Sequence, residues 1–355
     1  MNMSDFSTID KNFAVETKIE KQDIKFYSSE DEMFKIYGIY KEDGKYRRMP
    51  ESVAKIAATE RDDSGLVRLH SNTAGGRIRF VTDSSYVAIN VQIDTPSKLP
   101  HMAWTGSLGF DLYADNEFVN TFVPPWYVED KYESVIGLGE KKEREITINF
   151  PLYCNVTELY IGLQEDAIVK DPAPYKNKKP IVYYGSSITQ GACASRPGRS
   201  YQSIISRKFN YDYINLGFSG NAQAEETMIE YIKSLDMSAF VYDYDHNALT
   251  VEYLEKTHEK MFKAIREQHP DIPIIMMPRP KFYLTDKEIQ RHKIIETTYK
   301  NAIATGDKNV YFITSKELTK LCGNEGVVDD CHPNDFGFAS MAKALEGVME
   351  TINLI

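Results

Sequence analysis

Between about residues 65 and 163 the chain alternates apolar and polar positions in short segments. Turn residues such as those at 83–85 and 114–116 separate these segments. A period of two is typical of strands that bury one face, and repeated short strands with such turns are typical of antiparallel sandwiches. The pattern therefore predicts an antiparallel β-sandwich, or jelly roll, with strands at 77–81, 86–91, 109–113, 118–122, 146–150 and 159–163.

After residue 180 the pattern changes to apolar strands that alternate with longer amphipathic segments. Strands are expected near 181–184, 212–216, 239–243, 273–277 and 310–314, and helices near 251–266 and 286–304. Such alternation predicts a three-layer α/β/α domain around a mostly parallel five-stranded sheet, with active groups at the carboxyl ends of the strands. We therefore divide the chain into an N-terminal β-sandwich domain with an N-terminal extension (1–170), a proline- and lysine-containing linker (171–180) and a C-terminal α/β domain (181–355).

Composition agrees with two folded domains, because 355 residues exceed what one hydrophobic core usually organises. The 23 tyrosines and 17 phenylalanines are compatible with aromatic-lined grooves for sugar-like ligands. The four cysteines are scattered without the close pairs of a zinc ribbon, and we interpret them as free thiols: Cys154, Cys193, Cys322 and Cys331.

The net charge of -10 argues against a nucleic-acid partner, since no cluster of Lys and Arg is large enough to overcome it locally. Residues 1–6 lack the basic start and apolar core of a secretory signal, and no apolar run approaches the roughly 18 to 20 residues that span a bilayer. We expect a cytoplasmic protein without a membrane partner. Homo-oligomerisation stays possible.

The most informative motif lies at residues 183–191, where an apolar, β-prone run leads into Gly185-Ser186-Ser187 and then a helix-like segment. A strand that ends in this way presents a serine hydroxyl. Serine needs a base to become a nucleophile, and the base needs a group that orients it. Asp329 and His332, three residues apart near the C-terminus, suit those two tasks. Pro333 disfavours helical geometry at His332, so the last helix should begin near residue 334 or 335.

The sequence also offers three donors for an oxyanion, the charged oxygen of a tetrahedral intermediate. They are the backbone N–H of Ser187, the backbone N–H of Gly220 and the side-chain amide of Asn247, each after a predicted strand. Taken singly, Gly220 could serve only a turn and Asn247 only a helix cap. Their order and placement favour a shared role.

These residues carry a resemblance. The C-terminal half resembles the SGNH (GDSL-type) hydrolases, whose serine, glycine, asparagine and histidine blocks occur in this order. Residues 109–113 (Gly-Phe-Asp-Leu-Tyr) and 191–198 resemble the subgroup in which an N-terminal β-domain with a Gly-x-Asp-Leu-Tyr signature precedes the hydrolase domain. The chain departs from the family at Ser186, where many members have aspartate, and at residues 245–248 (Asp-His-Asn-Ala), where Gly-x-Asn-Asp is usual.

The resemblance implies Ser187 as nucleophile, His332 and Asp329 as the other members of the triad, and Ser187, Gly220 and Asn247 as oxyanion donors. It implies no metal and no organic cofactor. The implied activity is that of a carboxylic ester hydrolase that removes short acyl groups, often acetyl groups on carbohydrates. The expected partner is thus a small-molecule or oligosaccharide ester.

Three further side chains are candidate substrate contacts: Trp104, Arg196 and Arg279. Trp104 lies in a loop with a neighbouring imidazole, a composition suited to stacking on a sugar ring. The two arginines follow a motif or a strand end on the side of the predicted site. All three could equally anchor one domain to the other or lie on the surface.

Two rival functions stay open at this point. Asp243, Asp245 and His246, together with Asp329, Asp330 and His332, could form a metal site rich in oxygen and nitrogen ligands, which would make the protein a metal-dependent hydrolase. The chain could also be a carbohydrate-binding protein that keeps the fold without turnover. An acyltransferase or a longer-chain lipase that uses the same triad is a third possibility, although no long apolar lid-like segment supports it.

Overall fold

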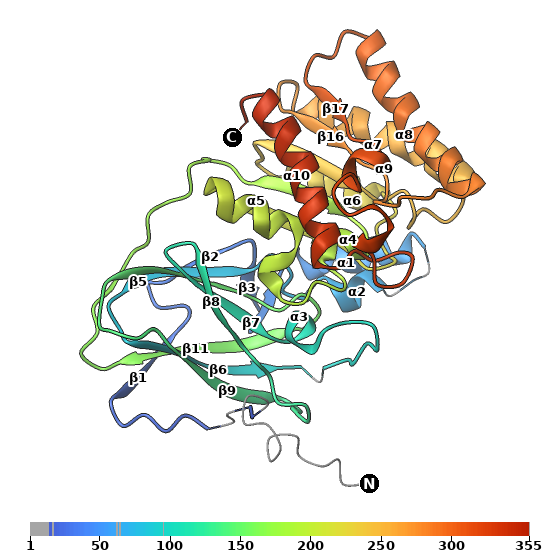
Figure 1. Ribbon diagram of the computed structural model, residues 1–355. Coiled ribbons are helices and arrows are strands. Elements are labelled where there is room, and N and C mark those ends of the chain that lie inside the picture. Colours follow the sequence, from blue (N-terminus) through green and yellow to red (C-terminus); the bar gives the residue numbers. More distant parts are fainter. Residues whose placement is uncertain (1–13, 16–17, 62, 64, 95, 355) are drawn as a thin grey trace.

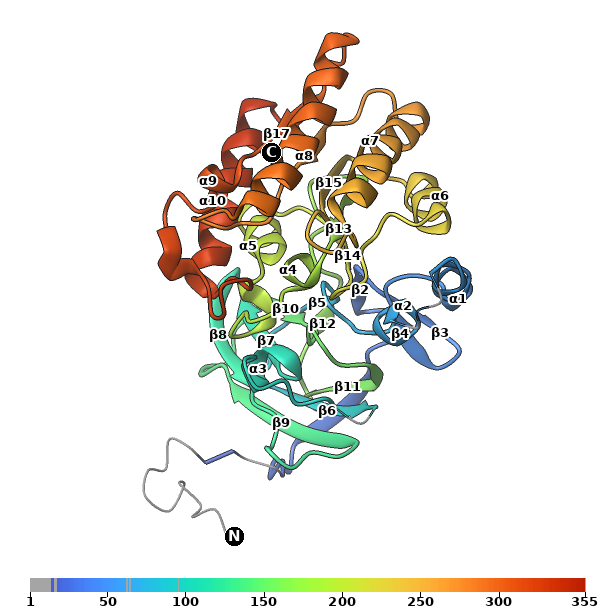
Figure 2. The same cartoon turned by 90° about the vertical axis from the view of Figure 1, so that its right-hand side faces the viewer.

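The computed structural model describes residues 14–15, 18–61, 63, 65–94 and 96–354. Residues 1–13, including the segment in which we found no secretory signal, lie outside the described residues. Figures 1 and 2 show a β-sandwich formed by the N-terminal part of the chain beneath a layered α/β domain formed by the C-terminal part.

The sandwich consists of two antiparallel sheets, as the period-two pattern predicts. One sheet has the order β1 (Ile24–Ser28), β11 (Val156–Gln164), β6 (Tyr86–Ile93) and β9 (Lys131–Gly137). The other has the order β12 (Val169–Lys170), β5 (Arg77–Thr82), β10 (Arg144–Asn149), β7 (Phe110–Ala114) and β8 (Glu117–Phe122), and β2 (Lys35–Tyr37) also pairs with β5. Strands β3 (Tyr40–Glu42) and β4 (Lys45–Arg47) form a separate hairpin, and α3 (Trp104–Ser107) precedes β7.

Alternation along the strands builds the sandwich core. In β6, Ile89, Val91 and Ile93 are buried, whereas Asn90 and Gln92 between them are exposed. Successive side chains of a strand point to opposite faces, so the apolar set meets the facing sheet. The buried cluster includes residues from both sheets, among them Phe80, Ile148 and Ile161.

The C-terminal domain contains a five-stranded sheet whose adjacent strands are all parallel. Its order is β14 (Tyr213–Gly217), β13 (Ile181–Gly185), β15 (Ala239–Asp243), β16 (Ile274–Met276) and β17 (Val310–Phe312). The helices are α4 (Ser187–Gln190), α5 (Tyr201–Phe209), α6 (Glu226–Ser234), α7 (Val251–Gln268), α8 (Asp286–Ala304), α9 (Ser315–Leu318) and α10 (Asp335–Thr351), with 3₁₀ turns η3 (Pro197–Arg199) and η4 (Gly323–Gly326).

Two separate apolar clusters on the two faces of this sheet confirm the three-layer arrangement. Val182 and Tyr184 of β13 belong to a cluster that includes α6, α7 and α8. Ile181 and Tyr183 of the same strand belong to another cluster that includes α5 and α10. Because a strand buried on both faces reads as a continuous apolar run, β13 lacks the polar alternation of the sandwich strands.

The segment between β4 and β5 leaves the sandwich and packs on the C-terminal domain (Figure 2). It contains α1 (Glu51–Thr59) and α2 (Gly65–Leu69). Ala54 and Leu66 are fully buried in the same cluster as α6, α7 and α8. This N-terminal segment therefore completes one helical layer of the C-terminal sheet beside β14.

The Gly-x-Asp-Leu-Tyr signature joins the two domains. Asp111 is fully buried in β7 and accepts hydrogen bonds from Asn149 Nδ2 at 2.7 Å, from the N–H of Gly198 at 2.7 Å and from Arg196 at 3.0 Å. Burial raises the pKa of Asp111 in spite of these partners. The aspartate of the signature thus contacts the segment that follows the serine turn.

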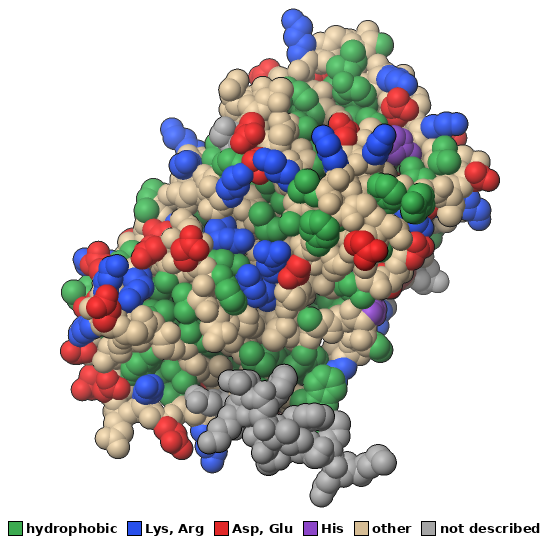
Figure 3. Space-filling model, in the orientation of Figure 1, with side chains coloured by type: hydrophobic (Ala, Val, Ile, Leu, Met, Phe, Trp, Pro, Cys, Tyr) green, Lys and Arg blue, Asp and Glu red, His purple; other side chains and the backbone are tan. Residues whose placement is uncertain are grey.

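Figure 3 shows that acidic and basic side chains are interspersed over both domains on that face. Among the described helices, none combines the length and the hydropathy that a membrane crossing requires.

Candidate active site

Ser187 lies at the carboxyl end of the sheet, where β13 ends and α4 begins. The Ser186 hydroxyl accepts a hydrogen bond from the N–H of Ile188 at 3.1 Å and caps the short helix. A side chain at Gly185 would overlap the Asp243 carboxylate, so only glycine lets the strand end this close to its neighbour. The turn therefore holds Ser187 in a fixed position at the edge of the sheet.

A chain of two hydrogen bonds connects this serine to an imidazole and a carboxylate. Ser187 Oγ lies 2.9 Å from His332 Nε2, and His332 Nδ1 lies 2.8 Å from Asp329 Oδ2. The other carboxylate oxygen, Asp329 Oδ1, accepts the backbone N–H groups of Cys331 and His332 at 3.1 and 2.8 Å. Partial burial works to raise the pKa of Asp329, but the hydrogen bonds from His332 outweigh it and lower this pKa below its ordinary value. Asp329 therefore stays ionised beside the imidazole.

The loop that carries the histidine is tightly built. Asp330 adopts a positive φ of 66°, and the N–H of Val328 donates to the carbonyl of His332 at 2.9 Å. Asn334 then caps α10 by accepting the N–H groups of Phe336 and Gly337 at 2.9 and 3.0 Å. The helix begins at residue 335, which confirms the start expected from Pro333.

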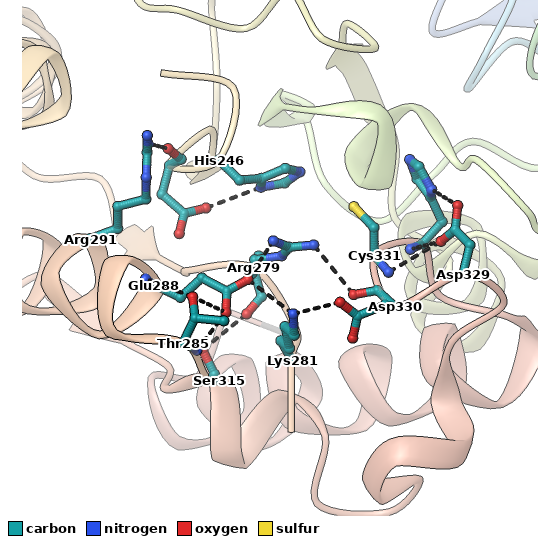
Figure 4. A network of polar contacts seen from close by, with 12 residues as sticks. His246, Arg279, Lys281, Thr285, Glu288, Arg291, Ser315, Asp329, Asp330 and Cys331 are labelled. Atoms are coloured by element: carbon teal, nitrogen blue, oxygen red, sulfur yellow. Dashed lines mark hydrogen bonds and ion pairs between the residues drawn. The ribbon is translucent and has the colours of Figure 1, made fainter. Parts of the chain in front are cut away.

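A network of ion pairs supports this loop from the side of β16 and α8 (Figure 4). Arg279 pairs with Glu288 at 2.6 Å, and Lys281 pairs with Asp330 at 2.8 Å and with Glu288 at 3.2 Å. Arg279 also lies 3.5 Å from the carbonyl oxygen of Asp330. Arg279 was one of the predicted substrate contacts. The structure places it against the histidine loop, where its partners are Glu288 and the carbonyl oxygen of Asp330.

The other two predicted substrate contacts also have protein partners. Arg196 lies 3.0 Å from Asp111, and its guanidinium lies 3.7 Å from the centre of the Phe118 ring, so it joins the two domains. Trp104 Nε1 donates to the carbonyl of Pro125 at 3.1 Å, and its ring lies 5.8 Å from that of Trp126. The Arg196 contacts match the anchoring alternative, whereas the Trp104 contacts lie within the sandwich. Neither side chain hydrogen-bonds to the triad in the described structure.

The three predicted oxyanion donors follow three adjacent strands. Ser187 follows the central β13, Gly220 follows β14 and Asn247 follows β15. The Ser187 N–H is at the first position of α4, where no helix carbonyl can accept it. Gly220 adopts a positive φ of 69°, and its N–H donates no hydrogen bond to a group in the described part of the chain.

The third donor has a defined orientation although its block departs from the family pattern. Asn247 Oδ1 accepts the N–H of Ala222 at 3.3 Å. Since the amide oxygen is used in this way, the amide nitrogen is the group left to donate elsewhere. The loss of the usual glycine and aspartate from this block is therefore compatible with an oriented Asn247.

The residues of the rival metal site are used within the fold. Asp243 accepts from the Thr189 hydroxyl at 2.6 Å, and Asp245 pairs with His246 Nδ1 at 3.2 Å. Within the described ranges, the group of metal-ligating atoms that lie within 4.8 Å of one another comes instead from His101, Cys193 and His332. Burial raises the pKa of Cys193 to about 12, whereas a metal ligand must lose the thiol proton.

Asp243 leads to a testable pH dependence of stability. Burial raises its pKa to about 8, above the ordinary 3.8, although Thr189 and Ser186 donate to it. Between the unfolded pKa of 3.8 and about pH 8, the folded protein therefore holds a proton that the unfolded chain has released. This contribution to stability is complete below the lower value and is lost progressively as pH rises to about 8. From about pH 6 to pH 8, we expect wild-type stability to fall relative to that of Asp243→Asn, by at most about 1.4 kcal/mol per pH unit. Thermal melts of both proteins across this range measure the difference, and parallel curves would contradict the assignment.

Two residues near the site were not predicted as functional. His101 Nε2, from the sandwich, lies 3.9 Å from Asp329 Oδ2, and its ring centre lies 5.5 Å from that of His332. The Tyr153 hydroxyl lies 3.4 Å from the carbonyl oxygen of Ser187. No local pattern marks Tyr153, and His101 was noticed only as a neighbour of Trp104. Both become visible when the sandwich is placed against the α/β domain.

Comparison with known families agrees with this geometry. Residues 178–350 match the GDSL-like lipase/acylhydrolase family, and residues 24–169 match the N-terminus of SGNH-hydrolase-type esterases. The chain belongs to the SGNH (GDSL-like) hydrolase family. Members of this family include ester hydrolases. The match to the N-terminus of SGNH-type esterases covers the domain that contains the Gly-x-Asp-Leu-Tyr signature.

Solved structures with the same fold span nearly the whole SGNH hydrolase chain. A protein from Bacteroides ovatus ATCC 8483 that is classified as a GDSL-like lipase is 27% identical to this chain, with a TM-score of 0.81. The match covers 94% of this chain and 98% of that protein. The salicylyl-acyltransferase SsfX3 from a tetracycline biosynthetic pathway is 18% identical (TM-score 0.76; 94% and 99% covered). The acetyl xylan esterase Est2A from Butyrivibrio proteoclasticus is 12% identical (TM-score 0.60; 92% and 98% covered). A search of curated proteins gave no significant match.

Proposed function

We propose that this ester hydrolase is a serine esterase that removes short acyl groups, acetyl above all, from a carbohydrate or a similar polyhydroxylated ester. The observation that carries the proposal is the pair of hydrogen bonds from Ser187 to His332 and from His332 to Asp329, at 2.9 and 2.8 Å. Nucleophile, base and orienting carboxylate in this order are the requirements of acyl transfer through serine.

In the proposed reaction Ser187 Oγ attacks the acyl carbon while His332 Nε2 takes the hydroxyl proton. The ionised Asp329 stabilises the imidazolium that forms. The N–H groups of Ser187 and Gly220 and the amide of Asn247 stabilise the oxyanion of the tetrahedral intermediate. His332 then returns the proton to the leaving alcohol oxygen, and water releases the acyl group from Ser187 by the same steps.

A cleft beside the Ser219–Asn221 turn, which contains the predicted oxyanion donor Gly220, supports a polyhydroxylated alcohol as the leaving group. Its volume is about 640 Å³, and it extends between the α2 segment and the loops that contain Tyr153 and Ser219. Most of its polar lining comes from the N-terminal domain, including Arg68, Asn72 and Asn155, and the C-terminal domain adds Ser219 and Asn221. A cleft with several hydrogen-bonding groups suits hydroxyl-rich ligands better than a long acyl chain. Among the structures with this fold, the Butyrivibrio protein is named an acetyl xylan esterase, which is in line with this substrate class.

The proposal predicts deacetylation of acetylated oligosaccharides. Mass spectrometry of xylo- and cello-oligosaccharide acetates, before and after incubation, should show loss of acetyl groups with the wild-type protein and none with Ser187→Ala. Parallel incubations with aryl butyrate and octanoate esters should give lower kcat/KM than aryl acetate. Faster cleavage of the octanoate would instead indicate a lipase.

The same assay with a chelator discriminates between the serine mechanism and the metal-dependent rival. Dialysis against EDTA should leave the rate within about twofold of the untreated protein, because no proposed step uses a metal. Loss of activity that zinc or manganese restores would favour the rival, and oligosaccharide binding without turnover would favour the carbohydrate-binding alternative.

A further inference from the structure

A buried arginine from the N-terminal segment supports the strand that leads to Gly220. Arg48 is 2% exposed, and its guanidinium donates to the carbonyl groups of Gly217 at 2.5 Å and Asn215 at 3.2 Å. The same guanidinium lies 4.6 Å from the centre of the Phe218 ring. The end of β14 is therefore fixed by a group that lies far away in the sequence.

A second arginine of this segment reaches the turn itself. Arg61 follows α1, and its Nη2 donates to Asn221 Oδ1 at 3.1 Å. The amide nitrogen of Asn221 in turn donates to the carbonyl of Ser219 at 2.7 Å. These two contacts connect Arg61 to the residues on either side of Gly220. Arg61 is held by Glu225, whose side chain is 1% exposed and whose Oε1 lies 2.6 Å from Arg61 Nε.

Close packing adds to these polar contacts. A Cβ atom on Gly65, the first residue of α2, would overlap the side-chain amide of Asn221. By contrast, a Cβ atom on Gly220 would meet no neighbour within 4 Å. The orientation of the Gly220 peptide therefore depends on the residues beside it. One of these, Asn221, is packed between Arg61 and α2.

We propose that Arg61 is a positioning residue of the esterase reaction, which holds the Ser219–Asn221 turn so that the Gly220 N–H is aimed at the oxyanion. The inference rests on the proposed function, and it extends that function by giving the N-terminal region a part in turnover. A donor stabilises a transition state only when it is oriented in advance, and an error of about 1 Å in such a group can cost on the order of 100-fold in rate.

The inference predicts an effect on kcat rather than on KM. In Arg61→Met, which keeps the aliphatic stem, we expect kcat for an aryl acetate to fall about 10- to 100-fold while KM changes less than about threefold. The affinity for an alkyl boronic acid, which forms a tetrahedral adduct on Ser187, should fall in parallel with kcat, whereas a purely structural role would leave it unchanged in the folded fraction. Arg61→Lys, which keeps the charge but not the two-sided contact, should recover only part of the loss.

Arg61→Met leaves the Glu225 carboxylate buried without its partner, which could prevent folding. Asn221→Ala tests the same contact from the other side without exposing a charge, and it should lower kcat and boronic acid affinity to a similar extent. If Arg61→Met does not fold, unchanged kcat in Asn221→Ala would overturn the inference, and a loss that Arg61→Lys shares would support it, because Asn221→Ala also removes the hydrogen bond to Ser219.

The matched control is Arg77→Met. Arg77 is also a buried arginine of the N-terminal region, but it pairs with Asp212 and donates to the carbonyl of Tyr213, at the opposite end of β14. The kcat and the boronic acid affinity of Arg77→Met should stay within about threefold of wild type. Equal behaviour of the Arg61, Asn221 and Arg77 variants in an active, Ser187-dependent enzyme would overturn this inference alone. Absence of Ser187-dependent turnover in the wild type would overturn the proposed function instead.

Discussion

Replacing Ser187 with alanine should lower kcat/KM for an aryl acetate by a factor on the order of 10⁴ to 10⁶. Ser187 is 3% exposed and its hydroxyl already lies 2.9 Å from the base, so the substitution removes the nucleophile with little change in packing. The residual rate should be that of a site that still binds substrate and stabilises the oxyanion.

Ser186→Ala is the control for this experiment. Ser186 is the adjacent residue and caps α4, so its loss should reduce stability by about 1 kcal/mol and leave kcat/KM within about tenfold of wild type. Near-normal turnover in Ser187→Ala would exclude Ser187 as the nucleophile, and an equal loss in both variants would point to damage of the turn.

The second large effect is expected at His332. Replacement by asparagine should lower kcat/KM by a factor on the order of 10⁴ or more, because no other group hydrogen-bonds to the Ser187 hydroxyl among the described side chains. Steady-state kinetics of the folded variant, with circular dichroism to establish folding, measure this loss.

His246→Asn is the informative comparison, since His246 also forms a pair with a carboxylate. Its Nδ1 lies 3.2 Å from Asp245, but its Nε2 is buried and makes no hydrogen bond in the described structure. The asparagine amide can still donate to Asp245, so kcat/KM should stay within about tenfold of wild type. A larger loss at His246 than at His332 would show that the base has been assigned to the wrong histidine.

Much of the C-terminal fold could be predicted because its elements carry strong local signals. The apolar runs at β13, β14 and β15 end within one residue of the predicted strands. Helix α8 begins at Asp286 as expected, where Thr285 and Glu288 form a capping box. The serine turn and the Asp329–His332 loop could be named for the same reason: each is a short motif whose chemistry is visible in consecutive residues.

The missing parts depend on contacts between distant segments. Strand β9 was not predicted, because its charged and polar residues give a weak apolar pattern and its pairing with β6 supplies the order. No pattern in residues 51–69 indicated that α1 and α2 pack on the C-terminal sheet. For the same reason Arg48 and Arg61 were not recognised, since an arginine in a sequence reads as a surface residue until its burial is known.

The candidate substrate contacts show the limit of such reasoning within the site. Arg196 and Arg279 were chosen because they follow a motif or a strand end, and both lie near the expected edge of the sheet. Their partners, Asp111 and Glu288, come from elements that the sequence could not place beside them. Position along the chain therefore predicted the neighbourhood of these side chains but not the direction in which they point.

The central claim is that Ser187 carries the acyl group during turnover, and acid-quench mass spectrometry of the enzyme mixed with an aryl acetate tests it most directly. The account predicts a transient mass increase of one acetyl group, located by peptide mapping on Ser187, that accumulates in the first turnover and is absent from Ser187→Ala. Acetylation of another residue during catalysis, or turnover by Ser187→Ala without any acyl-enzyme, would contradict it.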